Sequence, residues 1–256
     1  MNPGAVAITG ASSGIGAATA RQLAKPDVHL ALLGRDATRL AAVASDCQAK
    51  GAVCRTATID VRDADRISAF LAEFDKAHPI DLLLANAGIL DGRHADQSVE
   101  DGATARRVLE TNLLATIDVI HAVLPGMRVR QRGQIAIVAS LAALNPLPDA
   151  PAYAASKAAL LSYGLGLREA LAGDGIKVMV ACPGFVATAM AKIHLGPRPG
   201  EISSEAAATQ IIAGLERGRS LIGFPSIPFW FSRLCLLMPE ALRRQVTRGT
   251  RFHVGT

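Results

Sequence analysis

Short apolar segments alternate with longer segments of mixed polarity along most of the chain. Buried strands are predicted for six apolar runs, at residues 5–9, 28–33, 52–60, 80–88, 134–140 and 176–184. Helices are predicted for the stretches between them, at residues 15–25, 36–50, 63–78, 103–130 and 152–172. Strands that alternate with helices in this way predict a parallel sheet covered on both faces. The expected fold is therefore α/β, a doubly wound parallel sheet in a three-layer α/β/α arrangement, forming a single domain over residues 1–256.

The first predicted strand and helix are joined by the glycine-rich sequence TGASSGIG, residues 9–16. Glycine lets a backbone approach a pyrophosphate closely, and the free N–H groups at a helix start favour negative charge. This turn is a candidate phosphate-binding loop. Its spacing departs from the GxGxxG fingerprint, and a plain turn is the alternative. The candidate contacts are Gly10, Ser12, Ser13, Gly14, Ile15 and Gly16.

A second candidate site lies in the last predicted helix, where the sequence YAASK places Tyr153 four residues before Lys157. Residues four apart share one helix face, so a phenol and an ammonium can reach the same pocket. A nearby cation favours the ionised phenol, lowers its pKa and makes proton transfer near neutral pH less costly. The alternative is that Tyr153 packs in the core while Lys157 is solvated.

The composition fits one globular domain, with 50% hydrophobic and 19% charged residues in a chain of 256. The cysteines and histidines show no metal-ligand or disulfide spacing, and the first residues lack the pattern of a signal peptide. We therefore expect no metal site and a cytoplasmic protein. The net charge of +5 is unevenly placed, because residues 217–256 contain seven arginines and one glutamate, a charge of +6, which leaves −1 for the rest.

Six elements of the sequence together resemble the short-chain dehydrogenase/reductase family in order and approximate spacing. They are TGASSGIG, NAG at residues 86–88, Asn112, Ser140, YAASK and PGFVAT at residues 183–188, so that the resemblance covers residues 5–188. It implies a Rossmann-like domain that binds a nicotinamide cofactor. It also implies an oxidoreductase that transfers a hydride between this cofactor and a carbonyl or secondary alcohol. A homodimer or homotetramer, formed through the two long helices that carry Asn112 and Tyr153, is implied as well.

The resemblance further implies a catalytic tetrad, which consists of Asn112, Ser140, Tyr153 and Lys157. Reduction of a carbonyl places negative charge on its oxygen, so a hydrogen-bond donor and a proton source must lie beside that atom. In the family pattern Ser140 supplies the hydrogen bond and Tyr153 supplies the proton. Lys157 lowers the tyrosine pKa and binds the nicotinamide ribose. Asn112 holds a water that passes protons from Lys157 toward solvent.

The same resemblance implies the remaining cofactor contacts. Asp60 and Val61 correspond to the adenine-contacting positions, although a loop or helix-cap aspartate is the alternative for Asp60. The segment after the 176–184 strand corresponds to the one that holds the carboxamide, through the Val186 backbone and the Thr188 hydroxyl. The implied contacts beyond the glycine turn are Asp60, Val61, Asn86, Ala87, Gly88, Tyr153, Lys157, Pro183, Gly184, Val186 and Thr188.

The second predicted strand bears on the choice between NADP(H) and NAD(H). An acidic residue at its end holds the adenine ribose 2′-OH of NAD(H), whereas an arginine accommodates the 2′-phosphate of NADP(H). Here Gly34 stands where the acid is expected and Arg35 follows it, with Ser12 or Ser13 as helpers. NADP(H) is the preferred interpretation. If Asp36 faces the ribose instead of capping the next helix, NAD(H) is favoured.

The last quarter of the chain has two features of its own. Residues 189–203 are predicted to be a mobile loop, and in the resembled family the corresponding segment closes over the substrate. Residues 220–256 form an apolar and basic C-terminal segment, too short in its apolar run to span a bilayer. Residues 224–248 are interpreted in three ways: as a core or dimer contact, as the wall of an apolar substrate pocket, or as a helix resting on an anionic membrane surface. Nucleic acid is not expected as a partner, because no recognised binding module accompanies the arginines.

The leading functional hypothesis is an enzyme that transfers a hydride between NADP(H) and a small-molecule carbonyl or alcohol, with an apolar ketone as the substrate class. An alternative is an NAD(H)-dependent alcohol or sugar dehydrogenase. Another is a dinucleotide-binding sensor or scaffold that keeps the fold without catalysis. Such a protein is expected to lose Tyr153 or Lys157, and both residues are present.

Overall fold

The computed structural model describes residues 3–235, 237–239 and 253–254. Its strands are β1 (Ala5–Thr9), β2 (His29–Gly34), β3 (Val53–Thr58), β4 (Leu82–Ala85), β5 (Gly133–Val138), β6 (Ile176–Pro183), β7 (His194–Leu195), β8 (Leu221–Phe224) and β9 (His253–Val254). Its α-helices are α1 (Gly14–Leu23), α2 (Ala37–Gln48), α3 (Ala64–Ala77), α4 (Gly102–Leu109), α5 (Ala115–Val129), α6 (Pro151–Ala170), α7 (Ala189–Ile193), α8 (Ser204–Glu216) and α9 (Ser226–Cys235). A π-helical turn (Glu110–Leu114) joins α4 to α5, and short 3₁₀ turns cover Leu141–Leu144 and Ala172–Asp174.

The main sheet has seven strands in the order β3-β2-β1-β4-β5-β6-β8, and every neighbouring pair is parallel. Strands β2 and β3 are added on one side of β1, and the chain then crosses back so that β4 pairs with the other side of β1. This reversal of strand order creates a crevice at the carboxyl ends of β1 and β4, where ligands bind in doubly wound sheets. The predicted doubly wound parallel sheet is confirmed.

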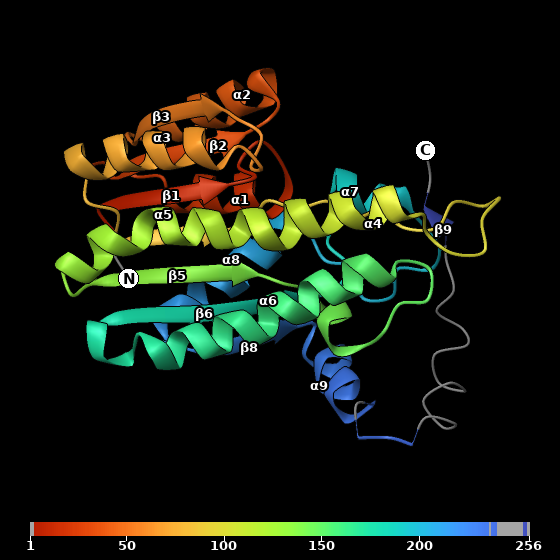
Figure 1. Cartoon of the computed structure of the whole chain (residues 1–256). Coiled ribbons are helices and arrows are strands. Elements are labelled where there is room, and N and C mark those ends of the chain that lie inside the picture. The colour runs from red at the N-terminus through yellow and green to blue at the C-terminus, as the bar shows by residue number, and fades with distance from the viewer. Residues whose placement is uncertain (1–2, 236, 240–252, 255–256) are drawn as a thin grey trace.

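Helices cover both faces of the sheet, as Figure 1 shows. Alternate residues of each strand point to opposite faces, so Ala5 and Ala7 join one core and Val6 and Ile8 join the other. The first core lies under α3, α5 and α6, and the second under α1, α2 and α8. This is the predicted three-layer arrangement in one domain.

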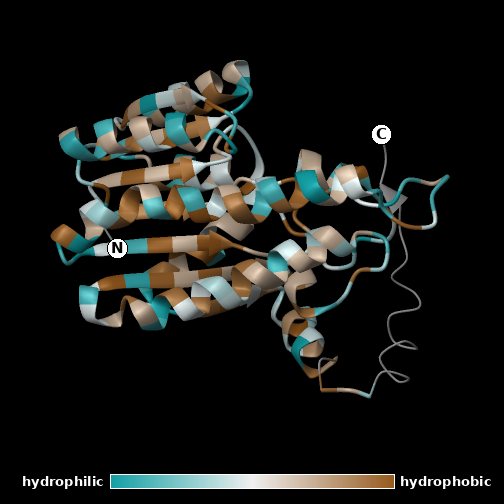
Figure 2. Ribbon diagram, in the orientation of Figure 1, coloured by the Kyte–Doolittle hydropathy of each residue, from teal (hydrophilic) through white to brown (hydrophobic). Residues whose placement is uncertain are grey.

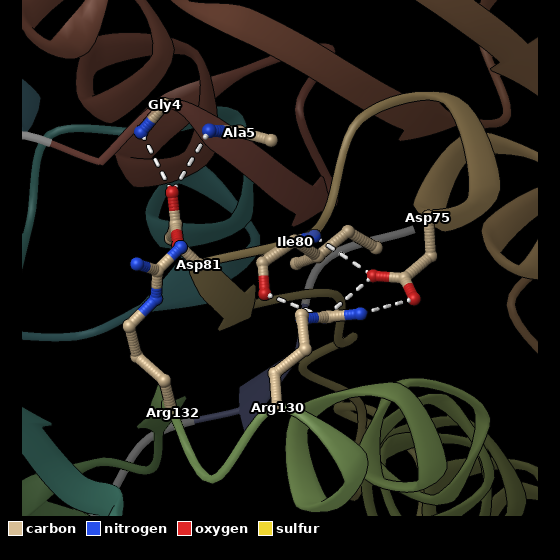
Figure 3. Close-up of polar contacts among 7 residues, drawn as sticks. All are labelled: Gly4, Ala5, Asp75, Ile80, Asp81, Arg130 and Arg132. Carbon is tan, nitrogen blue, oxygen red and sulfur yellow. Dashed lines mark hydrogen bonds and ion pairs between the residues drawn. The ribbon is translucent and has the colours of Figure 1, made fainter.

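Two aspartates clamp the strand starts at the amino end of the sheet (Figure 3). Asp81 accepts hydrogen bonds from the backbone N–H groups of Gly4 and Ala5 at 2.8 and 3.4 Å, and from Arg132 at 2.8 Å. The Asp75 carboxylate accepts hydrogen bonds from the two terminal nitrogens of the Arg130 guanidinium, each at 2.8 Å. The clamp ties the starts of β1, β4 and β5 together at the end of the sheet opposite the crevice.

The stretch Gly102–Val129 is long and apolar enough to cross a membrane by length and composition alone, with a mean hydropathy of 1.3 over an 18-residue window. Half of that window is buried inside the protein. Its apolar residues, such as Val119, Ile120 and Val123, join the core beside α3. The stretch is therefore placed as the core helix of this domain.

The carboxyl-terminal part differs most from the prediction. The segment 189–203, predicted as a loop, contains α7 and the strand β7, which pairs antiparallel with β9. The prediction also lacks α8 and β8 as separate elements, because α8 is rich in small and polar residues and β8 is only four residues long. Of residues 224–248, positions 236 and 240–248 lie outside the described residues. The predicted boundaries of the earlier elements agree with the structure to within a few residues.

Candidate active site

A cavity of about 920 Å³ lies at the carboxyl ends of the strands. Its size fits a dinucleotide together with a small substrate. It is lined by most of the predicted site residues: Gly10, Ser12, Ser13, Gly14, Ile15, Arg35, Val61, Asn86, Ala87, Gly88, Ser140, Tyr153, Lys157, Pro183, Gly184, Val186 and Thr188. Gly16, Asp60 and Asn112 are not among its lining residues.

The turn between β1 and α1 is built so tightly that it requires glycine. Gly10 and Gly14 have positive φ values of 66° and 54°. A Cβ on Gly16 would lie 2.4 Å from the Gly10 carbonyl oxygen, so α1 begins directly against the turn. Ser13, the N-cap of α1, makes no side-chain capping bond, which leaves the first N–H groups of the helix without a side-chain cap. This cradle fits the pyrophosphate of a dinucleotide.

The turn is held in place by β4. The Thr9 hydroxyl accepts hydrogen bonds from the backbone N–H groups of Asn86 and Ala87 at 3.0 and 3.1 Å. The side-chain amide of Asn86 donates to the carbonyl oxygens of Thr9 and Gly10 at 3.1 and 3.3 Å. Asn86 therefore fixes the shape of the glycine turn. Thr9 does the same from the other side, a role that the sequence analysis missed.

Two arginines line the cavity at the end of β2. Arg35 is exposed and follows Gly34, whose backbone lies against Ser12. Asp36 is the N-cap of α2, accepts from the Arg39 backbone N–H at 2.9 Å and pairs with its guanidinium at 2.8 Å. These hydrogen bonds from Arg39 lower the Asp36 pKa, so its carboxylate is charged and paired. The structure thus shows Asp36 as a helix cap, one of the two interpretations given above. The sequence analysis missed Arg39 as a residue of the cavity wall.

Asp60 lies outside the cavity wall, whereas its neighbours Ile59 and Val61 line it. The Asp60 carboxylate takes two hydrogen bonds from the Arg62 guanidinium at 3.1 and 2.8 Å. The hydrogen bond from Arg62 lowers the pKa of Asp60 to about 2. The structure therefore does not bring Asp60 to the other site residues, and its contact with adenine stays a prediction.

Helix α6 presents Tyr153 and Lys157 to the cavity, as the spacing of four predicts. Burial raises the pKa of Tyr153, and the hydrogen bond with the side chain of Ser140 acts in the opposite direction. The Lys157 ammonium lies 5.8 Å from the centre of the Tyr153 ring. The Tyr153 pKa is thus raised where the sequence predicted a lowered value, because burial outweighs the hydrogen bond with Ser140 and Lys157 is not among the groups that shift it. Tyr153 is therefore a protonated acid at neutral pH.

Lys157 is 4% exposed and donates a hydrogen bond to the Val138 carbonyl oxygen at 3.0 Å. Burial lowers its pKa from 10.5 to about 8. The ammonium is thus mostly charged at pH 7 and half deprotonated near pH 8. A buried lysine of this kind can exchange protons in the physiological range.

Asn112 is fully buried in the π-helical turn between α4 and α5. Its side-chain oxygen accepts from the Ile89 backbone N–H at 2.7 Å, and its amide donates to the Ile89 carbonyl and the Ser156 hydroxyl at 2.9 and 3.2 Å. The side chain thus joins the segment after β4 to α6. The structure assigns Asn112 a positioning role, and its handling of a water stays a prediction. π-Helical turns of this kind are frequent at functional sites.

Three residues that the sequence analysis missed shape the surroundings of Tyr153. The Glu100 carboxylate accepts from the backbone N–H of Ala152 at 2.7 Å and so caps the start of α6 from another segment. Burial raises the Glu100 pKa. The side-chain oxygen of Asn145, which lines the cavity, is buried with no hydrogen-bond partner among the described residues. Thr111 lines the cavity beside Asn112.

The part of the cavity beyond Ser140 and Tyr153 is mainly apolar. The apolar side chains come from the segments after β4 and β5 and from the region of α7 and α9: Leu90, Leu141, Leu147, Phe185, Met190, Pro228 and Phe231. Most of these positions lie in connecting segments whose approach to the site no local pattern predicts. Pro228 and Phe231 belong to the segment 224–248, which was considered as a pocket wall in advance, and Met190 belongs to the segment 189–203, which was predicted to close over the substrate.

Comparison with known proteins finds matches over most of the chain. The family model described as short chain dehydrogenase matches residues 4–195. An uncharacterized oxidoreductase of Myxococcus xanthus is 33% identical over 251 residues, which is 95% of this chain and 96% of that protein.

Two solved structures share the fold. A short-chain dehydrogenase from Sphingobium yanoikuyae in complex with NADPH superposes with a TM-score of 0.79, at 23% identity over 96% of both chains. A short chain dehydrogenase/reductase from Burkholderia phymatum in complex with NAD gives a TM-score of 0.81, at 24% identity over 90% of this chain and 92% of that one. The two carry different cofactors, so the likeness leaves the choice between NADP(H) and NAD(H) open.

Proposed function

Because the chain belongs to the short-chain dehydrogenase/reductase family of oxidoreductases, we propose that it is an NADP(H)-dependent reductase of apolar ketones. The observation that carries the proposal is Tyr153 hydrogen-bonded with Ser140 and sharing a helix face with the buried Lys157, in a cavity lined by Arg35, Arg39 and many apolar side chains. The nicotinamide cofactor supplies the hydride when bound.

Tyr153 donates its proton to the carbonyl oxygen of the substrate. Its raised pKa keeps the hydroxyl protonated at neutral pH, which suits the direction of reduction. Ser140 hydrogen-bonds with Tyr153 and places a second hydroxyl where the substrate oxygen becomes negative. The pair therefore stabilises the charge that develops during reduction and then removes it.

Lys157 restores the proton that Tyr153 loses. With a pKa of about 8, its ammonium gives up a proton far more readily than an exposed lysine does. Gly88 lies beside both Asn112 and Lys157, because a Cβ built on it would lie 3.1 Å from Asn112 Oδ1 and 3.5 Å from Lys157 Nζ. The positive charge of Lys157 also favours binding of the cofactor ribose and phosphates beside it.

The apolar lining supports a ketone as the substrate class. A ketone with an apolar body buries its surface against Leu147, Phe185 and Phe231, and burial of apolar area favours binding by roughly 25 cal/mol per Å². The unpaired oxygen of Asn145 offers one hydrogen-bond acceptor for a hydroxyl or amide on the same substrate. A sugar, with a hydroxyl on every carbon, would leave most of its polar groups unpaired.

The proposed function is tested by following the oxidation of NADPH and NADH with carbonyl compounds graded from polar aldehydes to long-chain and cyclic ketones. We expect turnover with NADPH whose kcat/KM rises with the apolar area of the ketone. Equal or higher activity with sugars would favour the alternative, an NAD(H)-dependent alcohol or sugar dehydrogenase. Binding of either cofactor without turnover of any compound would favour a sensor.

The preference for NADP(H) is tested at Arg35. Changing Arg35 to alanine should lower kcat/KM with NADPH by about 10- to 100-fold, the effect of losing charge-assisted hydrogen bonds to a phosphate, and should leave the value with NADH nearly unchanged. Steady-state kinetics with both cofactors measure the change. Arg39 lines the same cavity wall, so Arg39→Ala is a second variant that tests the contact with the phosphate.

Arg128→Ala is the matched control for these variants. Arg128 is an exposed arginine at the carboxyl end of α5, outside the cavity lining, where it pairs with Asp174 at 2.7 Å. The Arg128→Ala variant should leave kcat/KM unchanged with both NADPH and NADH. A preference for NADH in the unmodified protein would contradict the assignment of a 2′-phosphate contact to Arg35 and Arg39.

A further inference from the structure

Helix α9 exposes an apolar face to solvent. Its inner side is formed by Phe229, Ser232 and Cys235, which are all buried. On the opposite side are Ile227, Trp230, Phe231 and Leu234, with exposed fractions of 82, 63, 49 and 55%. Their spacing of i, i+3, i+4 and i+7 places these side chains on one stripe of the helix. Leu237, just beyond the helix, is 82% exposed.

This stripe is the reverse of the usual pattern, in which the apolar side of a surface helix packs on the protein. Helix α9 follows β8 and stands beside the layered body instead of covering the sheet (Figure 1). Figure 2 colours several positions of α9 as hydrophobic. A contiguous exposed patch of large apolar side chains marks a surface that contacts a partner or a membrane.

The charge beside the stripe is positive. Arg233 lies on the flank of the stripe, with its guanidinium 5.6 Å from the centre of the Trp230 ring and 5.9 Å from that of Phe229. The sequence continues with Arg243, Arg244, Arg248 and Arg251 and contains one acidic residue, Glu240, in the same stretch. Aromatic and aliphatic side chains with an arginine on their flank, in a sequence that continues with basic residues, are suited to the boundary between acyl chains and anionic headgroups.

The stripe also borders the mouth of the cavity. Pro228, Phe231 and Cys235 line the cavity from α9, and Phe231 is at the same time half exposed on the stripe. An apolar surface thus continues from the outside of α9 into the site of reaction. A lipid bilayer placed against α9 would therefore meet the entrance of the cavity.

We propose that α9 docks this protein on an anionic lipid bilayer, so that apolar substrate enters the cavity from the membrane. The helix has 10 residues, half of the ~20 that are needed to span a bilayer, so it lies in the plane of the interface. The proposal of docking depends only on the surface of α9. Delivery of substrate from the membrane rests in addition on the proposed function.

The experiment uses Trp230, which is the chain's single tryptophan and lies on the stripe. Vesicles of phosphatidylcholine alone and with phosphatidylglycerol are added to the full chain, and tryptophan emission and co-sedimentation are recorded. We expect an emission shift to shorter wavelength and sedimentation with the anionic vesicles, both reduced by salt. No shift and no sedimentation at low salt would overturn the proposal.

The variant Ile227→Glu/Leu234→Glu places two charges on the stripe without touching the cavity wall. It should weaken binding to anionic vesicles by at least roughly ten-fold, because charged side chains at a lipid-facing position cost several times the lost apolar contact. Val129→Glu is the matched control, since Val129 is 86% exposed at the far end of α5. Binding by the double variant equal to that of the control would overturn the assignment to α9.

Two further measurements separate docking from the proposed reaction and from self-association. The double variant should reduce a short, water-soluble ketone at the normal rate and lose the faster turnover of a long-chain ketone dissolved in vesicles. Vesicle binding without turnover of any ketone would support docking and contradict the proposed function. A dimer that the double variant dissociates, with no vesicle binding, would show that the stripe contacts a second copy instead.

Discussion

Changing Tyr153 to phenylalanine should lower kcat for ketone reduction by about 10³-fold, the middle of the range for the loss of a positioned general acid. The reason is that no other protonated side chain in the described part of the cavity lies beside Ser140 and on the same face as Lys157. The dissociation constant for NADPH should change little, since the phenyl ring preserves the packing around the Lys157 ammonium. Stopped-flow or steady-state kinetics, with cofactor binding measured separately, give the two values.

Tyr163→Phe is the matched control. Tyr163 is the chain's second tyrosine, and it lies on the same helix with its hydroxyl 3.0 Å from His121 Nε2, outside the cavity lining. The control should retain normal turnover. If Tyr153→Phe reduced ketones at the rate of Tyr163→Phe, Tyr153 would not be the acid.

Changing Lys157 to methionine should abolish most of the activity and at the same time stabilise the protein without cofactor. The fold holds the lysine pKa at about 8 instead of 10.5, which corresponds to roughly 3 kcal/mol of unfavourable burial of the charge. Methionine fills a similar volume without charge but loses the hydrogen bond to Val138, worth about 1 kcal/mol. The net gain in the free energy of unfolding at pH 7 should be about 2 kcal/mol.

This gain should depend on pH in a defined direction. Below pH 8 the lysine is charged in both the folded and the unfolded chain, so the folded protein bears the whole cost of burial. Between pH 8 and 10.5 the folded protein releases the proton while the unfolded chain keeps it, so the cost falls as pH rises. The difference in stability between the methionine variant and the original protein should therefore shrink over this interval.

Urea unfolding at several pH values measures this difference. Lys177→Met is the control, because Lys177 is exposed at the start of β6 and should show no such pH dependence. The original protein should also lose reductase activity as pH rises through about 8, when Lys157 loses the proton that it supplies. A methionine variant less stable than the original at pH 7 would contradict the burial argument.

The strands and the glycine turn could be predicted because their signals are local. Apolar runs such as residues 5–9 and 28–33 identify a buried strand without reference to the rest of the chain. The Tyr153–Lys157 pair follows from helix geometry alone. Asp36 could be interpreted as a cap because it directly precedes a helix, and the structure shows it in that place.

The features that escaped prediction depend on contacts between distant segments. Glu100 caps a helix that begins 51 residues later, and the carboxylate of Asp149, fully buried, pairs with Arg93 at 2.9 Å across 56 residues. The pKa of Tyr153 was expected to fall because the sequence shows a neighbouring cation and does not show the depth of burial. The exposed stripe of α9 has the same amphipathic period as a core helix, so only the packing of Phe229 tells which side faces inward.

The aspartate clamp at the amino end of the sheet determines how the molecule can be attached to a solid support. Gly4 and Ala5 are held by Asp81 at the edge farthest from the cavity, so a linker joined before Gly4 leaves from the face opposite the entrance. A sensor chip carrying the protein by that linker would present α9 and the cavity mouth outward, toward vesicles in the flowing buffer.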